Sequence, residues 1–164
     1  MNDADSFKII KVESKSEVEI TRELFLEYAQ SLDFHLCFQD FEREVTELPG
    51  EYAPASGSLL LLMSEGKAAG CVALRKIDRK VCEMKRLYVR PEFRGMGFGK
   101  KLTLTVIDEA KKMGYRFIRL DTVPSMKEAI KLYQFLGFKE IKPYRKNPIE
   151  GAIFMELELK HVPK

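Results

Sequence analysis

Residues 88–114, with the sequence YVRPEFRGMGFGKKLTLTVIDEAKKMG, pass from a β-rich run into an amphipathic helix. Three glycines, Gly95, Gly97 and Gly99, occupy alternate positions directly before that helix. The first N–H groups of a helix have no intrahelical partner and carry part of a positive charge, so they attract anions. Glycine also lets the backbone approach a ligand closely. The segment therefore predicts a phosphate-binding loop, with a purely structural glycine turn as the alternative.

Two common phosphate-binding patterns do not fit this loop. The P-loop pattern G-x-x-x-x-G-K-[ST] fails because Arg94 stands five residues before Gly99 and Lys101 follows the Gly-Lys pair. The dinucleotide pattern G-x-G-x-x-G fails because Lys100 fills the place of the third glycine. The pattern that fits is R-x-x-G-x-G, from Arg94 to Gly99. It is short enough to occur by chance, so its meaning depends on the rest of the chain.

The rest of the chain alternates between strand-like and helix-like patterns. Val18 and Leu24 fall on one helical face, and Ser16 with Glu19 three residues later matches a capping box. Turn residues at 65–67 divide an apolar stretch into two strands. The expected strands are 7–12, two within 58–78, 81–91, 116–123 and 152–159, and the expected helices are 16–32, 38–48, 99–113 and 125–137. Antiparallel strands followed by a βαβα order predict an α/β fold whose sheet has mixed pairing.

Composition narrows the class of protein further. The chain has 164 residues, 45% of them apolar and 32% charged, which is typical of one globular domain, 1–164. No apolar run approaches the roughly 20 residues that span a bilayer, and the N-terminus does not resemble a secretory signal. Cys37, Cys71 and Cys82 are widely spaced and lack metal-ligand spacing, which indicates reduced thiols. We therefore expect a cytoplasmic protein that uses neither a membrane nor a metal.

Charge is distributed unevenly along the chain. Residues 1–74 carry 6 Lys and Arg against 14 Asp and Glu, whereas residues 75–119 carry 14 against 5. A basic middle suits a phosphate-bearing ligand and an acidic N-terminal part suits a cation such as an amine; two solvated faces are the alternative. Nucleic-acid binding is disfavoured, because the positive charges cluster around the glycine loop and no nucleic-acid motif is present.

Two blocks of sequence carry a family resemblance. EMKRLYVRPEFRGMGFGKKL, residues 83–102, and LDTVPSMKEAIKLYQFLGFKEI, residues 120–141, resemble the GNAT superfamily of acetyl-CoA-dependent N-acetyltransferases. The resemblance covers residues 58–159. It implies a GNAT-like α/β fold, in which a mixed, mostly antiparallel sheet of about 6–7 strands with a central parallel pair is flanked by about 4 helices. It also implies acetyl-CoA as the cosubstrate, and many relatives pair as homodimers.

The resemblance assigns the cofactor site mainly to the backbone. The glycine loop would hold the CoA pyrophosphate through its N–H groups, and the strand 87–89 would face the pantetheine arm in a gap beside the strand 117–123. An N–H in this strand would face the thioester oxygen. Side-chain identity at Met96 and Phe98 is expected to matter little. The implied cofactor residues are Leu87, Tyr88, Val89, Arg94, Gly95, Met96, Gly97, Phe98, Gly99 and Lys100.

Glu83 and Tyr133 are the expected catalytic residues. In similar proteins a carboxylate at the place of Glu83 often takes the amine proton, directly or through water. Strand alternation puts Glu83 on the same face as Lys85 and Leu87, and partial burial is expected to raise its pKa. An exposed carboxylate paired with Lys85 or Arg86 is the alternative. Tyr133 stands where the family has a tyrosine near the CoA sulfur, as a proton donor to the leaving thiolate; a core aromatic is the alternative.

The acceptor side is less clearly marked in the sequence. Met126 stands where the family usually has asparagine, which argues against a side-chain hydrogen bond to the cofactor there. The candidate substrate-binding residues lie in two loops and are Phe34, His35, Phe38, Gln39, Tyr144 and Asn147. The expected function is transfer of the acetyl group to a primary amine of a small molecule or peptide, by direct attack in a ternary complex. A non-catalytic CoA-binding or sensing domain on the same fold is the alternative.

Overall fold

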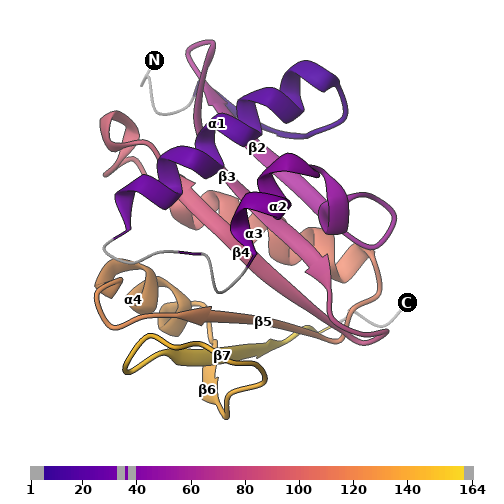
Figure 1. Ribbon diagram of the computed structural model, residues 1–164, viewed down its shortest axis with the longest axis vertical. Coiled ribbons are helices and arrows are strands. Elements are labelled where there is room, and N and C mark those ends of the chain that lie inside the picture. Colours follow the sequence, from indigo (N-terminus) through magenta and orange to yellow (C-terminus); the bar gives the residue numbers. More distant parts are fainter. Residues whose placement is uncertain (1–5, 33–35, 37–39, 161–164) are drawn as a thin grey trace.

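A seven-stranded sheet with the order β1-β2-β3-β4-β5-β7-β6 forms the centre of the computed structural model, which describes residues 6–32, 36 and 40–160 (Figure 1). Within these residues β4 and β5 form the one parallel pair, and the other neighbours are antiparallel. The strands are β1 Phe7–Lys11, β2 Ser58–Ser64, β3 Lys67–Lys76, β4 Val81–Val89, β5 Phe117–Thr122, β6 Lys139–Ile141 and β7 Ile153–Glu158.

Helices cover both faces of this sheet. In Figure 1, α1 and α2 lie in front of the sheet, α3 lies behind it, and α4 lies beside β5. The helices are α1 Lys15–Ser31, α2 Phe41–Thr46, α3 Phe98–Lys112 and α4 Lys127–Phe135, with short 3-10 turns at Gly50–Tyr52 and Pro91–Phe93. The prediction of a mixed, mostly antiparallel sheet with one parallel pair and four flanking helices is confirmed.

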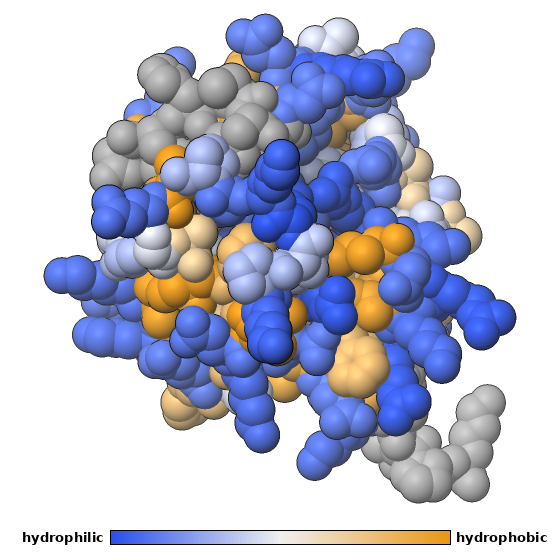
Figure 2. Space-filling model, turned by 60° about the horizontal axis from the view of Figure 1, so that its bottom comes forward, coloured by the Kyte–Doolittle hydropathy of each residue, from blue (hydrophilic) through white to orange (hydrophobic). Residues whose placement is uncertain are grey.

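Alternation along the central strands builds two apolar cores, one on each face of the sheet. Leu60 of β2 packs with Val106 of α3, whereas its neighbour Leu61 packs with Leu24 of α1; all four are nearly or fully buried. The outer surface is mostly hydrophilic, with apolar patches between the charged side chains on the face that Figure 2 shows. None of the described helices is long and apolar enough to cross a bilayer.

The predicted turn between β2 and β3 is confirmed. Glu65 and Gly66 connect the strands and have φ of 52° and 77°. Positive φ at both central residues is the geometry of a type I′ hairpin turn, which matches the twist of the flanking strands. Gly66 therefore has a structural reason to be glycine.

The predicted capping box is wrong by two residues. The Ser14 side chain accepts from the Glu17 N–H at 3.2 Å, and the Glu17 carboxylate accepts from the Ser14 N–H at 3.0 Å. Ser16 and Glu19 have the same spacing, so the pattern alone cannot separate the two pairs. Pairing with the sheet fixes which pair is used. The Val12 N–H still donates to the Leu59 carbonyl at 2.9 Å, and α1 begins directly after it.

The parallel strands β4 and β5 separate partway along their length. Their register pairs are Val81 with Phe117, Cys82 with Ile118 and Glu83 with Arg119. Beyond these pairs β4 runs on to Val89 without hydrogen-bonding to β5. The two strands therefore open into a split from residue 83 onward, as the family resemblance implied.

A β-bulge in β4 lies inside this split. The pairing with β3 shifts register between Cys71 and Ala73, and Arg86 has φ of 62° in the left-handed region. Leu87 packs with the core on the α3 side, whereas Tyr88 belongs to the core on the α1 side. The prediction that Leu87 shares a face with Glu83 is therefore wrong, because the extra residue reverses the alternation.

Candidate active site

The glycine loop forms the N-terminal end of α3. Gly97 is the N-cap residue with φ of 78°, and Gly95 has φ of 83°. The first hydrogen bond into the helix runs from the Lys101 N–H to the Gly97 carbonyl at 3.1 Å, and no described side chain caps this end. The preceding N–H groups are thus available to an anion. The two glycines are needed because L-residues rarely adopt this φ.

Side chains around the loop hold it in place. Arg94 donates from Nε to the Val89 carbonyl at 3.0 Å, which ties the loop to the end of β4. Lys100 lies with its Nζ 4.7 Å from the Phe135 ring of α4. Phe98 is 1% exposed and belongs to the apolar core on the α3 side. The Phe98 side chain thus has a structural role in the first turn of α3, and its small importance for cofactor contacts stays a prediction.

The split between β4 and β5 holds a small cavity of about 70 Å³. Leu87 and Lys85 line it from β4, Asp121 and Thr122 from β5, and Tyr133 from α4. The Thr122 hydroxyl is buried without a hydrogen-bond partner among the described residues. An elongated ligand that enters the split would therefore meet open strand backbone on one side and polar side chains on the other.

Tyr133 is a core aromatic that also lines the split, and its role as a proton donor stays a prediction. It is 6% exposed and packs against Phe138 with ring centroids 5.6 Å apart, and it also lines the cavity in the split. Burial raises the pKa of the Tyr133 phenol above its ordinary value. At neutral pH it therefore keeps its proton and can act as a hydrogen-bond or proton donor in the split.

Glu83 lies fully buried at the point where β4 and β5 part. Its carboxylate accepts from Arg75 Nε at 2.8 Å and from the Tyr144 hydroxyl at 2.6 Å, and Arg145 also contacts it. Burial raises the pKa of Glu83, but the charges of Lys85, Arg145 and Arg75 together outweigh burial and lower it. The expected raised pKa is therefore wrong: Glu83 is an ionised anchor between two arginines.

A second acidic residue extends this network into the split. Asp121 of β5 accepts from Arg145 at 3.0 Å and from Asn147 Nδ2 at 3.1 Å. Arg145 thereby bridges Glu83 on one strand and Asp121 on the next. The structure thus brings two of the predicted acceptor residues, Tyr144 and Asn147, to the same network as Glu83. Phe34, His35, Phe38 and Gln39 lie outside the described residues.

Lys85 and Arg86 are buried basic residues beside the split that the sequence suggested only as partners of an exposed Glu83. Burial and then the charge of Arg86 lower the pKa of Lys85 to about 7. Arg86 forms a two-pronged ion pair with Glu44 of α2, with both N–O distances 2.8 Å. This pair holds the bulge residue against α2, which accounts for a non-glycine residue at positive φ.

Arg75 could have been found from the hairpin between β3 and β4. The register places Arg75 directly opposite Glu83, so that the two side chains share a face. Arg145 offers no comparable signal, because it lies 62 residues after Glu83 in an irregular loop. A buried glutamate needs cationic partners, but the sequence does not say which ones.

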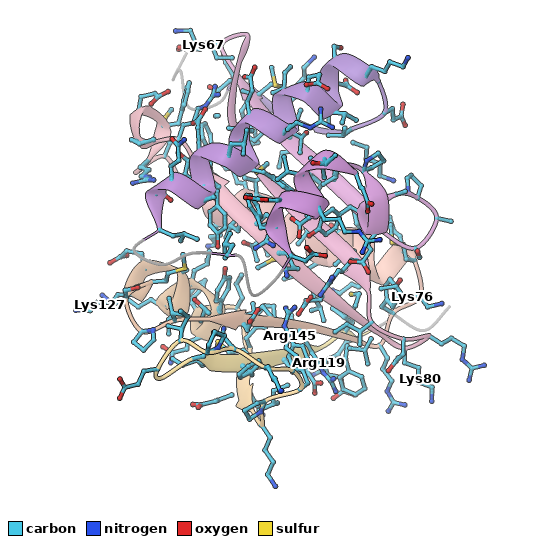
Figure 3. The ribbon with its side chains drawn as sticks, viewed as in Figure 1. Lys67, Lys76, Lys80, Arg119, Lys127 and Arg145 are labelled. Atoms are coloured by element: carbon cyan, nitrogen blue, oxygen red, sulfur yellow. The ribbon has the colours of Figure 1, made fainter. Side chains whose placement is uncertain are left out.

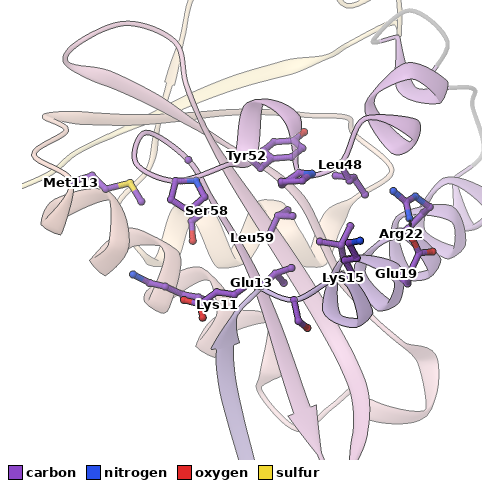
Figure 4. A pocket seen from close by; sticks show the side chains of 16 residues that line it. Lys11, Glu13, Lys15, Glu19, Arg22, Leu48, Tyr52, Ser58, Leu59 and Met113 are labelled. Atoms are coloured by element: carbon purple, nitrogen blue, oxygen red, sulfur yellow. Dashed lines mark hydrogen bonds and ion pairs between the residues drawn. The ribbon is translucent and has the colours of Figure 1, made fainter.

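The largest described cavity lies elsewhere in the molecule. It has a volume of about 580 Å³, and Lys15 at the start of α1 and Met113 line it from opposite sides (Figure 4). Met113 follows the C-terminal end of α3, about 22 Å along the helix from the glycine loop. This cavity therefore has no part in the site at the split.

Comparison with known proteins identifies the family of this chain. Residues 18–138 match the Acetyltransferase (GNAT) family, and the chain therefore belongs to this family. An uncharacterized N-acetyltransferase of Schizosaccharomyces pombe is 36% identical over 94% of this chain and 96% of its own length.

Solved structures agree on the fold. A GNAT-family acetyltransferase of Staphylococcus aureus superposes with a TM-score of 0.78 at 23% identity, covering 94% of this chain and 99% of that one. A GNAT-family acetyltransferase of Elizabethkingia anophelis, solved with acetyl-CoA bound, gives a TM-score of 0.70 at 24% identity with the same coverage. The protein is an acetyltransferase by family, built on the fold that these structures share.

Proposed function

We propose that this protein transfers the acetyl group of acetyl-CoA to a primary amine by direct attack within a ternary complex. The observation that carries the proposal is the position of the split between β4 and β5 directly beside the uncapped, glycine-led end of α3. The split suits the thioester arm of acetyl-CoA, and the end of α3 suits its diphosphate. The Elizabethkingia protein of the same fold is described with acetyl-CoA bound, which supports the same ligand here.

The cofactor would be held mainly by main-chain groups. The N–H groups between Gly95 and Lys100 would bind the pyrophosphate, with Lys100 adding positive charge. The backbone of Leu87, Tyr88 and Val89 is not paired with β5 and would hydrogen-bond to the pantetheine arm. We assign the N–H that would bind the thioester oxygen to Leu87 or Tyr88. These residues follow the bulge, where the pairing of β4 with β3 shifts by one residue.

Tyr133 is proposed as the proton donor to the departing thiolate. It faces the split from α4, and its raised pKa keeps it protonated until the thiolate forms. Acetyl transfer forms a C–N bond and breaks a C–S bond, so one proton must leave the amine and one must reach the sulfur. A phenol in the split can serve the second of these transfers.

Glu83 is proposed as the residue that receives the amine proton, directly or through water. Its lowered pKa makes it a weak base that is ionised throughout the neutral range. Lys85 lines the same split, and its pKa of about 7 makes it the stronger base when it is neutral. The two side chains share a strand face, so a proton taken near Glu83 can pass to Lys85 or to solvent.

We place this reaction in the cytoplasm, because Cys71 and Cys82 are both buried free thiols. The test has two parts. Acetyl-CoA should raise the melting temperature of the purified protein, since a ligand that binds only the folded state stabilises it. Thiol release from acetyl-CoA should then depend on an added amine. A melting shift without turnover on any amine would favour the sensing alternative, and no shift at millimolar acetyl-CoA would contradict the cofactor assignment.

A further inference from the structure

Thr122 lies on the side of the split that β5 forms. β5 pairs with β4 only up to Arg119, so Thr122 stands three residues beyond the last pair. On its other side its backbone pairs with Ile153 of β7. Figure 3 shows Lys127, at the start of α4, apart from Arg119 and Arg145, which lie where β4 and β5 still pair. The end of β5 that leads into α4 is therefore the open end of the split.

The Thr122 hydroxyl is buried but has nothing to bond to in the described part of the chain. Thr122 is 6% exposed, and among the described residues that line the cavity in the split it alone has a buried side-chain oxygen or nitrogen without a hydrogen-bond partner. Asp121 in the same cavity, by contrast, accepts from both Arg145 and Asn147. A buried hydroxyl without a partner is costly, so proteins rarely keep one unless a ligand or water completes the bond.

The surroundings of this hydroxyl are those of a ligand site. Strand alternation places Thr122 on the same face of β5 as Ile118 and Leu120, which are buried in the apolar core on the α3 side. Tyr133 of α4 and Leu87 of β4 pack against the same core and line the same cavity. Thr122 is thus the polar member of an otherwise apolar strand face. In ligand pockets such isolated polar groups fix the orientation of the ligand.

We propose that the Thr122 hydroxyl binds an amide of the pantetheine arm of CoA, from the side of the split opposite the backbone of β4. The inference rests on the proposed acetyltransferase function, which places this arm in the split. A threonine hydroxyl suits an amide because it can donate to the carbonyl and accept from the N–H. The main chain of β4 and one side chain of β5 would then hold the arm between them and fix how far the thioester reaches toward Tyr133.

Thr122→Ser and Thr122→Ala form the main test, because both remove the methyl group and only the alanine variant removes the hydroxyl. Isothermal titration calorimetry with CoA measures the affinity of each variant. The serine variant should bind CoA within about twofold of the wild type. The alanine variant should bind about fivefold or more weakly than the serine variant, the usual effect of removing one hydrogen bond. Equal affinity of the two variants would overturn the proposal.

Fragments of CoA locate the contact. Adenosine 3′,5′-bisphosphate lacks the arm, whereas 4′-phosphopantetheine contains it, and competition with CoA measures the binding of both. Relative to Thr122→Ser, Thr122→Ala should weaken the binding of 4′-phosphopantetheine by the same factor as that of CoA and leave adenosine 3′,5′-bisphosphate unchanged. Equal loss for both fragments would mean that the substitution disturbs the whole site, which contradicts a contact with the arm.

The stability of the free protein is an independent readout. Since the hydroxyl has no described partner in the chain, Thr122→Val should leave the melting temperature of the free protein unchanged or raise it. A lower melting temperature would show that the hydroxyl serves the fold and would contradict the proposal.

Ser64→Ala is the matched control. The Ser64 hydroxyl is also buried without a described partner, but it lies in β2, which β3 separates from β4. Its loss should leave the affinity for CoA unchanged. A decrease in Ser64→Ala as large as that in Thr122→Ala would assign the effect to general packing and not to the split.

The two proposals fail in different ways. If the wild-type protein does not bind CoA, the proposed function itself is wrong. If the wild type binds CoA and Thr122→Ala binds it as tightly as Thr122→Ser, only the role of Thr122 is wrong.

Discussion

The two halves of the candidate site are built in different ways. The proposed cofactor half, residues 87–100, is one continuous segment whose main-chain groups left unpaired by β5 and α3 would face the ligand. The proposed acceptor half is a hydrogen-bonded network of side chains from four separate segments, and its members are Arg75, Glu83, Asp121, Tyr144 and Arg145. A site made of contiguous backbone can be predicted from a glycine pattern. A site made of side chains distant in sequence can be identified only from the three-dimensional structure. Exchanging the side chains of the second half can change the acceptor without disturbing the first.

The largest effect is expected from Gly97→Val in the cofactor half. Valine at φ of 78° costs about 1–2 kcal/mol and would move the N–H groups that precede α3. We expect the acetyl-CoA melting shift to disappear. Gly66→Val is the matched control, because Gly66 has φ of 77° and equal space around it but lies in the β2–β3 turn. Equal loss of the shift in both variants would mean that general strain, and not the loop, is responsible.

The next largest effect is expected from Glu83→Gln in the acceptor half. The change keeps the shape but leaves Arg75 and Arg145 facing a neutral amide, and it removes the proposed proton acceptor. We expect kcat to fall by about a thousandfold while acetyl-CoA still stabilises the protein. Glu109→Gln, which breaks the ion pair of the buried Glu109 of α3 with Lys11 at 2.8 Å, serves as the control. An unchanged kcat in Glu83→Gln would remove Glu83 from the chemistry.

Tyr133→Phe tests the point where the two halves meet. The variant keeps the ring that packs against Phe138 and removes only the hydroxyl. A decrease in kcat of about a hundredfold with little change in KM for acetyl-CoA is expected if the phenol protonates the thiolate. Tyr115→Phe is the control, since its buried hydroxyl donates to the Ser56 carbonyl at 2.6 Å and is remote from the split. A normal kcat in Tyr133→Phe would leave Tyr133 as a core aromatic.

The pH dependence tests Lys85 separately from Glu83. Lys85 is charged below its pKa of about 7 and neutral above it, so a rate that needs the neutral amine rises with pH and levels off above that value. Between pH 5 and 6 the rate should rise about tenfold. Lys85→Met should abolish this dependence. A rate that is already constant from pH 5 upward in the wild type would assign the proton transfer to Glu83, whose pKa is lowered.

The smallest effect is expected from Met126→Asn at the start of α4. Met126 is the N-cap residue, and its side chain makes no capping hydrogen bond. Asparagine is a preferred N-cap residue, so the free energy of unfolding should increase by about 1 kcal/mol. Urea unfolding measures this change. If acetyl-CoA affinity increases as well, the asparagine usual in the family also serves the cofactor half; a variant no more stable than the wild type would show that the cap does not form.

The conformation of the glycine loop could be predicted because its signals are local. Glycine at positions 95 and 97 is required by positive φ, and the turn at Gly66 has the same cause. The bulge at Arg86 could not be predicted, because arginine is not a turn residue and the buried pair with Glu44 holds its backbone. This single residue also reversed the expected face of Leu87.

The acceptor half was predicted only in part, for a physical reason. The family resemblance and the loop composition proposed Glu83, Tyr144 and Asn147, which the structure joins in one network, but the expected direction for the pKa of Glu83 is wrong. Burial was foreseen, whereas the charges that outweigh it come from Arg75 and Arg145, the latter brought in by a distant loop. Electrostatic environment depends on all neighbours in space, so it follows from the fold and not from one strand. The strand β6 was not predicted, because its three residues are too few to show the alternation of apolar and polar residues that marks a strand.

The most direct measurement is a titration of ¹⁵N-labelled protein with CoA, followed by the backbone amide signals. The account predicts that the largest shifts occur in the amides of residues 94–100 at the start of α3 and of residues 87–89 in the split. Amides around the 580 Å³ cavity at the start of α1 should shift least. Shifts concentrated at that cavity, with the glycine loop unchanged, would contradict the account.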